Sequence, residues 1–278
     1  MAIDHTVVGY TAEPVRLKWT KKDAIIYALG VGAGTEHLQF TTDNTKSSPQ
    51  KCFPTFAVIV GSSGQPFTKL GSYELAKLVH GGQEIELLGE IPPEGEVETV
   101  SRISAIWDKG TSAIVEMTSE SSDTSTGKLL MRTVSSLFFR GEGGWGGERG
   151  PSSKMLFPER EPDFVSTYKT RADQALLYRL SGDRNPLHTD PAFAKRAGFE
   201  RPILHGLCTY GITGRALLEH ACGGDVGKFK SFKGKFSKPV YPGDELTVSI
   251  WREGTSFVFR TQKQDGTIVF DDGSFTLR

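Results

Sequence analysis

The sequence has little of several features that mark large classes of protein. Its 278 residues include only three cysteines, an odd and sparse set that fits a reducing compartment better than a disulfide framework. No apolar run approaches the ~18 residues that a transmembrane helix needs. The 33 basic and 33 acidic side chains cancel, whereas a nucleic-acid-binding protein usually carries a clear positive excess. We therefore expect a globular protein with no membrane span and no nucleic-acid partner.

The positive charge is concentrated in the second half of the chain. Residues 1–140 carry 13 basic and 16 acidic side chains, and the remaining residues carry 20 and 17. Five lysines without an intervening acid lie at Lys228, Lys230, Lys233, Lys235 and Lys238. Two interpretations fit this cluster: it binds the phosphates of a small polyanion, or it consists of solvated lysines on an edge strand that resist aggregation.

A glycine-rich stretch divides the chain. Residues 140–150 read RGEGGWGGERG, with six glycines in eleven positions, and a segment rich in proline and charge follows. Such a composition is typical of a linker or a long surface loop. The length allows roughly two domains. The predicted organisation is an N-terminal unit over 1–140, a linker over 141–160 and a C-terminal unit over 161–278.

The two units resemble distant copies of each other. Three short matches occur in the same order: KDAIIYALGVG (22–32) with ADQALLYRLSGD (172–183), His80-Gly81 with His205-Gly206, and PEG (93–95) with Pro242-Gly243. Each match is weak alone, but their common order predicts a duplicated unit.

The second unit shows the clearer secondary structure. Asp190-Pro191 is typical of an N-cap followed by the first helical residue, and the apolar spacing over 204–220 predicts a buried helix that ends at Gly223-Gly224. Strand-like runs follow at 228–236, 245–251, 256–262 and 267–270. The pattern predicts an α+β fold in which an antiparallel sheet wraps around one helix.

The first unit has no room for the same helix. After His80-Gly81-Gly82 only nine residues precede Pro92-Pro93, so we expect its central helix to be lost or shortened. The space would either hold a long apolar ligand or be filled by other side chains.

Asp183, Asn185 and His188 lie within six residues. A carboxylate and an imidazole that share one water can perform general acid–base chemistry, and a carboxamide can orient that water. The alternative is a capped turn in which Asp183 and Asn185 accept hydrogen bonds from backbone amides.

Gly206 stands at the predicted start of the long helix, where its amide can stabilise an oxyanion. Alternatively, Gly206 only permits a tight turn and His205 is a hydrogen-bonded structural residue. The six histidines show no metal-binding spacing with Cys or Asp, so no metal site is expected. Cys208 is most simply a core residue.

Together these motifs resemble a known family. The strings YRLSGDRNPLH (178–188), DPAFA (190–194) and AGFERPILHGLCT (197–209) are similar to the signature of hydratase 2, the (R)-specific enoyl-CoA hydratases of the MaoC-like group. The first unit adds YALGVG (27–32), CFPTF (52–56), LVHG (78–81) and DKG (108–110), and the second adds KPVYPG (238–243). These strings resemble the hydratase units of peroxisomal multifunctional enzymes over nearly the whole chain.

The resemblance implies a double hot-dog fold, a homodimer and hydration of trans-2-enoyl-CoA to (3R)-3-hydroxyacyl-CoA. It implies that Asp183 and His188 are the acid–base pair, that Asn185 assists and that the Gly206 amide holds the thioester oxygen. It further implies an acyl-CoA site lined by His80, Gly81, Lys109 and Phe236. Because Gly32 aligns with Asp183, only the second repeat is expected to be active.

The resemblance also implies fatty-acid β-oxidation in the peroxisome, within a larger multifunctional polypeptide, with no cofactor beyond the CoA of the substrate. The last residues, TLR (276–278), are not the Ser-Lys-Leu type of peroxisomal signal. The residues alone leave two other functions open: a hot-dog acyl-CoA thioesterase and a non-catalytic acyl-CoA-binding module.

Overall fold

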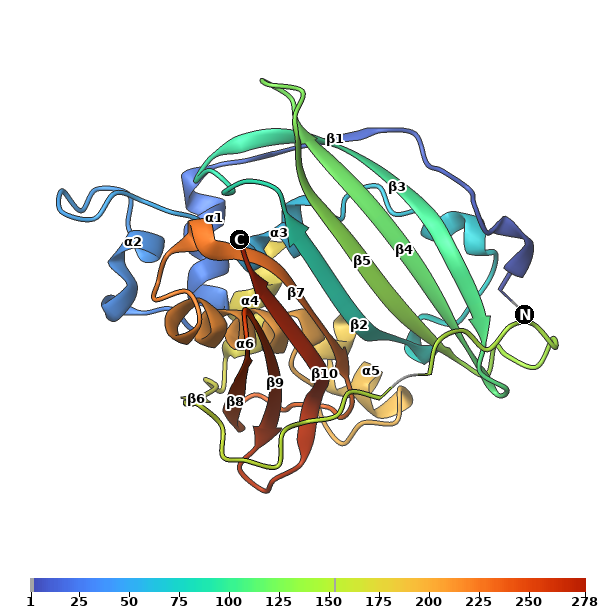
Figure 1. Cartoon of the computed structure of the whole chain (residues 1–278). Coiled ribbons are helices and arrows are strands. Elements are labelled where there is room, and N and C mark those ends of the chain that lie inside the picture. The colour runs from blue at the N-terminus through green and yellow to red at the C-terminus, as the bar shows by residue number, and fades with distance from the viewer. Residues whose placement is uncertain (1–2, 153) are drawn as a thin grey trace.

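The computed structural model describes residues 3–152 and 154–278, so residue 153 of the predicted linker lies outside the described residues. Ten strands form one antiparallel sheet in the order β1-β3-β4-β5-β2-β7-β10-β9-β8-β6 (Figure 1). The strands are β1 (Val15–Trp19), β2 (Leu78–Leu87), β3 (Gly95–Asp108), β4 (Ser112–Asp123), β5 (Leu129–Arg140), β6 (Phe164–Lys169), β7 (Phe229–Phe236), β8 (Glu245–Glu253), β9 (Ser256–Lys263) and β10 (Ile268–Leu277).

The strand order is the same in both halves when it is followed from each outer edge. β1, β3, β4, β5 and β2 form one half, and β6, β8, β9, β10 and β7 repeat that order in the other. The halves join where β2 pairs with β7 in an antiparallel register from Gly82↔Lys235 to Glu86↔Ser231. This arrangement confirms the predicted duplication and the α+β double hot-dog fold.

The central helix of the second repeat is α6 (Gly206–His220). Ten of its 15 residues are buried, and the sheet curls around it, as Figure 1 shows. The other helices are α1 (Lys21–Gly30), α2 (Leu38–Thr41), α3 (Ala57–Val60), α4 (Gln174–Tyr178) and α5 (Pro191–Arg196). Asp190 caps α5 as predicted, because its side chain accepts hydrogen bonds from the amides of Ala192 and Phe193.

The first repeat has a shortened helix, as expected, but not at the predicted place. Its counterpart of α6 is the 3₁₀ turn Pro54–Phe56 followed by the four-residue α3, which comes before β2 as α6 comes before β7. His80 lies inside β2, whereas His205 directly precedes α6. The match between the two His-Gly pairs was therefore wrong, since a two-residue string with apolar neighbours fits a strand as well as a helix start.

The other two sequence matches are confirmed. α1, which carries Tyr27, follows β1 just as α4, which carries Tyr178, follows β6, and the two rings pack with centroids 6.1 Å apart. Gly95 begins β3, and Pro242-Gly243 precedes β8, so both turns lead into equivalent strands.

The glycine-rich segment is held against the end of β3. The Asp108 carboxylate accepts hydrogen bonds from the amides of Gly144 (2.9 Å) and Gly146 (2.8 Å), and the Asp108 amide donates to the carbonyl of Glu148. None of the helices in the described part of the chain is long and apolar enough to cross a membrane.

Candidate active site

The turn after α4 carries the predicted acid–base residues. The Asp183 carboxylate accepts from the Asn185 amide at 3.0 Å, and the Asn185 side-chain oxygen accepts from the Leu187 amide at 3.0 Å. Asn185 thereby caps the 3₁₀ turn Pro186–His188. Both side chains cap backbone amides, as the alternative interpretation held, and the same turn directs His188 inward, where it is only 8% exposed.

One ring nitrogen of His188 points toward Asp183. Its Nδ1 lies 2.9 Å from the carbonyl oxygen of Ile203, so Nδ1 carries the proton and donates it. Nε2 then presents a lone pair to Asp183 Oδ2, 4.0 Å away. Two acceptors at this separation can hold one water between them, each taking one of its hydrogens.

Burial sets the charge of His188. Desolvation lowers the pKa of His188 below 6.5, although the Asp183 charge and the hydrogen bond to Ile203 act in the opposite direction. The imidazole is therefore neutral near pH 7 and is available as a base.

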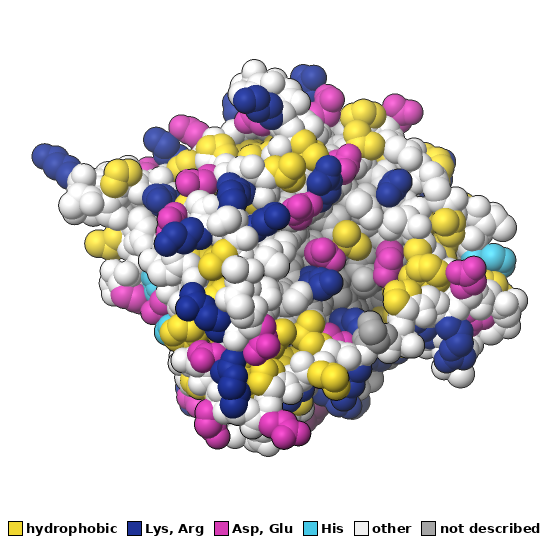
Figure 2. All heavy atoms as spheres, viewed as in Figure 1, with side chains coloured by type: hydrophobic (Ala, Val, Ile, Leu, Met, Phe, Trp, Pro, Cys, Tyr) yellow, Lys and Arg dark blue, Asp and Glu magenta, His cyan; other side chains and the backbone are white. Residues whose placement is uncertain are grey.

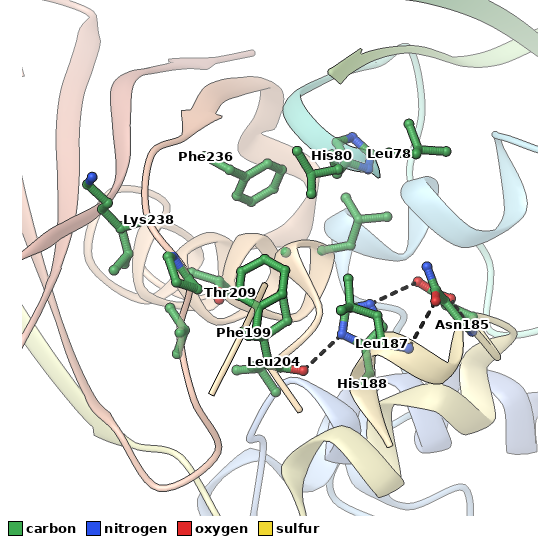
Figure 3. Close-up of a pocket in the computed structure, with 18 of the residues that line it drawn as sticks. Leu78, His80, Asn185, Leu187, His188, Phe199, Leu204, Thr209, Phe236 and Lys238 are labelled. Carbon is green, nitrogen blue, oxygen red and sulfur yellow. Dashed lines mark hydrogen bonds and ion pairs between the residues drawn. The ribbon is translucent and has the colours of Figure 1, made fainter. Parts of the chain in front are cut away.

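The pair opens into a cavity of about 310 Å³ to which both repeats contribute (Figure 3). Asp183, Asn185, His188 and Gly206 line it, together with His80 and Phe236. Most of the remaining wall is apolar: Phe67, Leu78, Val79, Leu137, Leu187, Phe199, Ile203, Leu204, Leu207, Pro239, Val240 and Val269. An apolar cavity with a few converging polar groups suits a ligand with a hydrocarbon part.

Gly206 is the first residue of α6 and lines the same cavity. Its amide is one of the N–H groups that a helix start leaves without an intrahelical acceptor, and the helix dipole favours negative charge there. A Cβ at this position would lie 3.4 Å from the ring of Phe236, so glycine keeps the approach to the amide open.

The predicted substrate-binding residues are only partly at the cavity. His80 and Phe236 line it and pack edge to face, with ring centroids 5.4 Å apart. His80 Nε2 donates to the carbonyl of Gly82 at 2.9 Å, and burial lowers the pKa of His80 to about 4. Gly81 and Lys109 are not among the lining residues that the structure describes, and Lys109 Nζ donates to the carbonyl of Arg149.

The five clustered lysines do not line the cavity as a group. Among the described residues of the cavity wall, Lys238 is its only member, and Lys235 pairs with Asp272 at 2.9 Å. β7 lies inside the sheet between β2 and β10, so the edge-strand interpretation was wrong. On the face seen in Figure 2, basic and acidic side chains are interspersed.

Sequence reasoning missed two features of the site. Arg140 and Phe199 line the cavity and stack as a cation–π pair at 5.6 Å, although they are far apart in sequence. Asp183, His188 and His205 bring one ligand atom each within 4.8 Å of one another and could hold a metal ion. His188 and His205 are seventeen positions apart, so no short motif indicates this grouping.

The first repeat offers no second carboxylate at the equivalent place. Gly32 follows Tyr27 by the same five positions by which Asp183 follows Tyr178. A Cβ at Gly32 would overlap the ring of Tyr168, and Gly32 has a φ of +83° that disfavours any other residue. Tyr168 of the second repeat thus fills the space that a counterpart of Asp183 would need.

A sheet curled around a central helix, with an Asp–His pair beside the helix start, defines a hot-dog protein with a candidate acid–base site. Family models agree with this class: residues 17–141 match the MFE-2 hydratase 2 N-terminal domain, and residues 154–272 match the MaoC-like domain. The chain belongs to the MaoC-like hydratase 2 family.

Relatives of this family span almost the whole chain. A 3-hydroxyacyl-thioester dehydratase Y of Mycobacterium tuberculosis is 45% identical over 99% of this chain and 98% of its own. A probable enoyl-CoA hydratase 2 of Dictyostelium discoideum is 39% identical over 96% of this chain and 94% of its own.

Solved structures show the same similarity. A MaoC-like dehydratase from Phytophthora capsici superposes with a TM-score of 0.88 at 32% identity and covers 100% of this chain and 98% of its own. The full-length peroxisomal multifunctional enzyme type 2 of Drosophila melanogaster gives a TM-score of 0.82 at 37% identity, over 96% of this chain and 48% of that enzyme.

Proposed function

We propose that this chain catalyses the reversible hydration of trans-2-enoyl-CoA to (3R)-3-hydroxyacyl-CoA. The observation that carries the proposal is the separation of 4.0 Å between Asp183 Oδ2 and His188 Nε2, both acceptors, in the cavity that Gly206 also lines. The names of the relatives, enoyl-CoA hydratase and 3-hydroxyacyl-thioester dehydratase, describe the two directions of such a reaction.

In the proposed mechanism, Asp183 and His188 hold one water between them. As its oxygen bonds to C3 of the enoyl group, one water proton passes to the pair, and the pair delivers a proton to C2. The negative charge that develops on the thioester oxygen is stabilised by the Gly206 amide. The Asn185 oxygen is occupied by the Leu187 amide, so its NH₂ group remains available to donate toward the water or the substrate.

We infer that the reaction needs no metal or redox cofactor, because water addition to an enoyl thioester requires only proton transfer and an oxyanion donor. The test is the hydration rate after treatment with EDTA, which is expected to equal that of the untreated protein. A rate that falls with EDTA and returns with added metal would instead assign a metal to Asp183, His188 and His205.

The proposal also covers the oligomeric state, the subcellular location and the metabolic pathway. We propose a homodimer that works in fatty-acid β-oxidation, as a unit of a larger polypeptide in the peroxisome. The match to half of a full-length peroxisomal multifunctional enzyme supports this, whereas the bacterial relative matches over its full length and favours a free-standing chain elsewhere. Light scattering of the purified protein and microscopy of a tagged full-length product test these points.

The deciding experiment uses crotonyl-CoA and trans-2-decenoyl-CoA with a chiral assay of the product. We expect loss of the enoyl absorbance and formation of the (3R) isomer. Release of free CoA without loss of that absorbance would identify a thioesterase. Tight binding with neither change would identify an acyl-CoA-binding module, and a (3S) product would contradict the proposed stereochemistry.

A further inference from the structure

His205 is a second buried histidine beside the acid–base pair. It is 1% exposed and directly precedes Gly206, the first residue of α6. Its ring stacks on that of His188, with centroids 3.7 Å apart and an interplanar angle of 27°. It also packs at 5.0 Å against the buried ring of Tyr178.

A polar contact joins His205 to the other member of the pair. His205 Nε2 lies 3.4 Å from the backbone carbonyl oxygen of Asp183, so Nε2 carries the proton and donates it. His205 thus touches His188 through its ring and Asp183 through its nitrogen. No other histidine in the described part of the chain stacks on His188 or donates a hydrogen bond to the Asp183 carbonyl.

Packing alone does not explain a histidine here. Its Nδ1 is buried and has no hydrogen-bond partner among the described residues, a situation that costs folding free energy. A phenylalanine would fill the same space without that cost. Burial and the nearby His188 lower the pKa of His205 to about 3, so the ring stays neutral and adds no charge to the site.

We propose that His205 is a positioning residue that holds the His188 ring and the Asp183 backbone at the separation that binds one water. Its effect on turnover rests on the proposed hydratase function, whereas its effect on the geometry of His188 does not. Because Gly206 follows it directly, His205 also couples the pair to the start of α6.

Three substitutions separate the two contacts. His205→Phe keeps a ring for stacking and loses the hydrogen bond, His205→Gln keeps a donor and loses the ring, and His205→Ala removes both. The matched control is His220→Gln, because His220 lies at the other end of α6 and stacks on Phe164 at 5.5 Å, away from the cavity.

The first readout is steady-state hydration of crotonyl-CoA. Since a misplacement of about 1 Å can cost roughly 100-fold in rate, we expect kcat to fall about 100-fold in His205→Ala and about 10-fold in His205→Phe and His205→Gln. KM, and the Kd for the unreactive butyryl-CoA, should change by less than about threefold because substrate binding is retained. His220→Gln should match the wild type.

The second readout needs no turnover. Imidazole ¹⁵N signals should show His188 as a single Nδ1–H tautomer near pH 7 in the wild type, and as a mixture of tautomers in His205→Ala. If the wild type fails to hydrate crotonyl-CoA, the proposed function is wrong, and this signal still decides the positioning role.

Two results would overturn the proposal. One is wild-type kcat and unchanged His188 signals in all three variants. The other is a loss of kcat in His205→Phe and His205→Gln that only follows a loss of folded protein, as measured by thermal unfolding, because the residue would then be structural.

Discussion

The groups proposed to react occupy one short turn, and backbone contacts orient each of them. Asp183 and Asn185 accept from amides within the turn, and His188 donates to the carbonyl of Ile203 from another segment. Each side chain has one contact to the backbone and one face toward the cavity. Single substitutions can therefore abolish proton transfer while the chain still folds.

Asp183→Asn and His188→Gln test the pair. Each keeps the approximate shape but loses a group that exchanges protons, so we expect kcat to fall about 10²–10⁴-fold with the melting temperature nearly unchanged. The matched control is Asp173→Asn, an exposed carboxylate ten residues earlier that pairs with Arg171. Substantial hydration by both variants would contradict the assigned roles.

The pH profile tests the protonation state of His188. Hydration needs its neutral form, and burial lowers the pKa of His188 below 6.5. Because protonation removes the base, kcat/KM should stay level as pH falls from 8 to about 6.5 and should decline only below that value. A decline that begins near pH 7 or above would show that His188 is not a buried neutral base.

At the scale of elements, the start of α6 supplies the proposed oxyanion donor. Gly206 is the first helical residue, where an amide has no intrahelical acceptor, and His205 before it is extended at φ −57°, ψ 133°. A proline is compatible with both features, because it suits the first helical position and an extended residue before it.

Gly206→Pro and Gly206→Ala therefore isolate the amide. Proline removes the N–H, and we expect kcat to fall about 10²–10³-fold, as for loss of other single oxyanion donors. Alanine keeps the N–H and adds a methyl group near Phe236, so its loss should be smaller. Equal hydration rates in the two variants would show that the amide does not contribute.

The shortened helix of the first repeat leaves a crevice of about 190 Å³. The apolar part of its wall consists of Ile59 and Val60 of α3 together with Leu17, Trp19, Ile26, Phe56 and Leu180. Leu180 and Ser181 come just before Asp183, so one stretch of chain borders both the crevice and the cavity. Side chains thus fill only part of this space, and the binding of a long apolar ligand in the rest of it stays a prediction.

Ile59→Trp tests whether the crevice takes a long acyl chain. Each CH₂ that leaves water contributes about 0.8 kcal/mol, so filling the crevice should lower the rate ratio of decenoyl-CoA to crotonyl-CoA by about 10-fold or more. Leu176→Trp, on the exposed face of α4, is the control. An unchanged ratio would place the acyl chain elsewhere.

At the scale of the whole molecule, the two repeats form one unit around α6. The helix approaches the first repeat so closely that a Cβ at Gly211 would overlap Val31 and Tyr27, and a Cβ at Gly214 would overlap Thr55. The cavity likewise takes His80 from one repeat and His188 from the other.

Gly211→Ala tests this packing. Within an ordinary helix the change stabilises by about 1 kcal/mol, but here we expect overpacking to lower the free energy of unfolding by about 1–3 kcal/mol. Chemical denaturation measures the change, and Glu219→Ala, exposed on the same helix, is the control. A more stable Gly211→Ala variant would show that the contact between the repeats is loose.

The sequence by itself determined the parts whose physics is local. It predicted α6 from apolar spacing, the cap at Asp190, the alternating strands of the second repeat and the cluster of Asp183, Asn185 and His188. It could not place the shortened helix, because His80-Gly81 fits a strand and a helix start equally well.

Only the tertiary structure decided which distant groups meet. It placed His205 against His188, brought Arg140 and Phe199 to the cavity wall, and put β7 in the interior of the sheet. It also placed the Tyr168 ring where a counterpart of Asp183 in the first repeat would lie. These outcomes depend on long-range strand pairing and close packing, which no short stretch of sequence encodes.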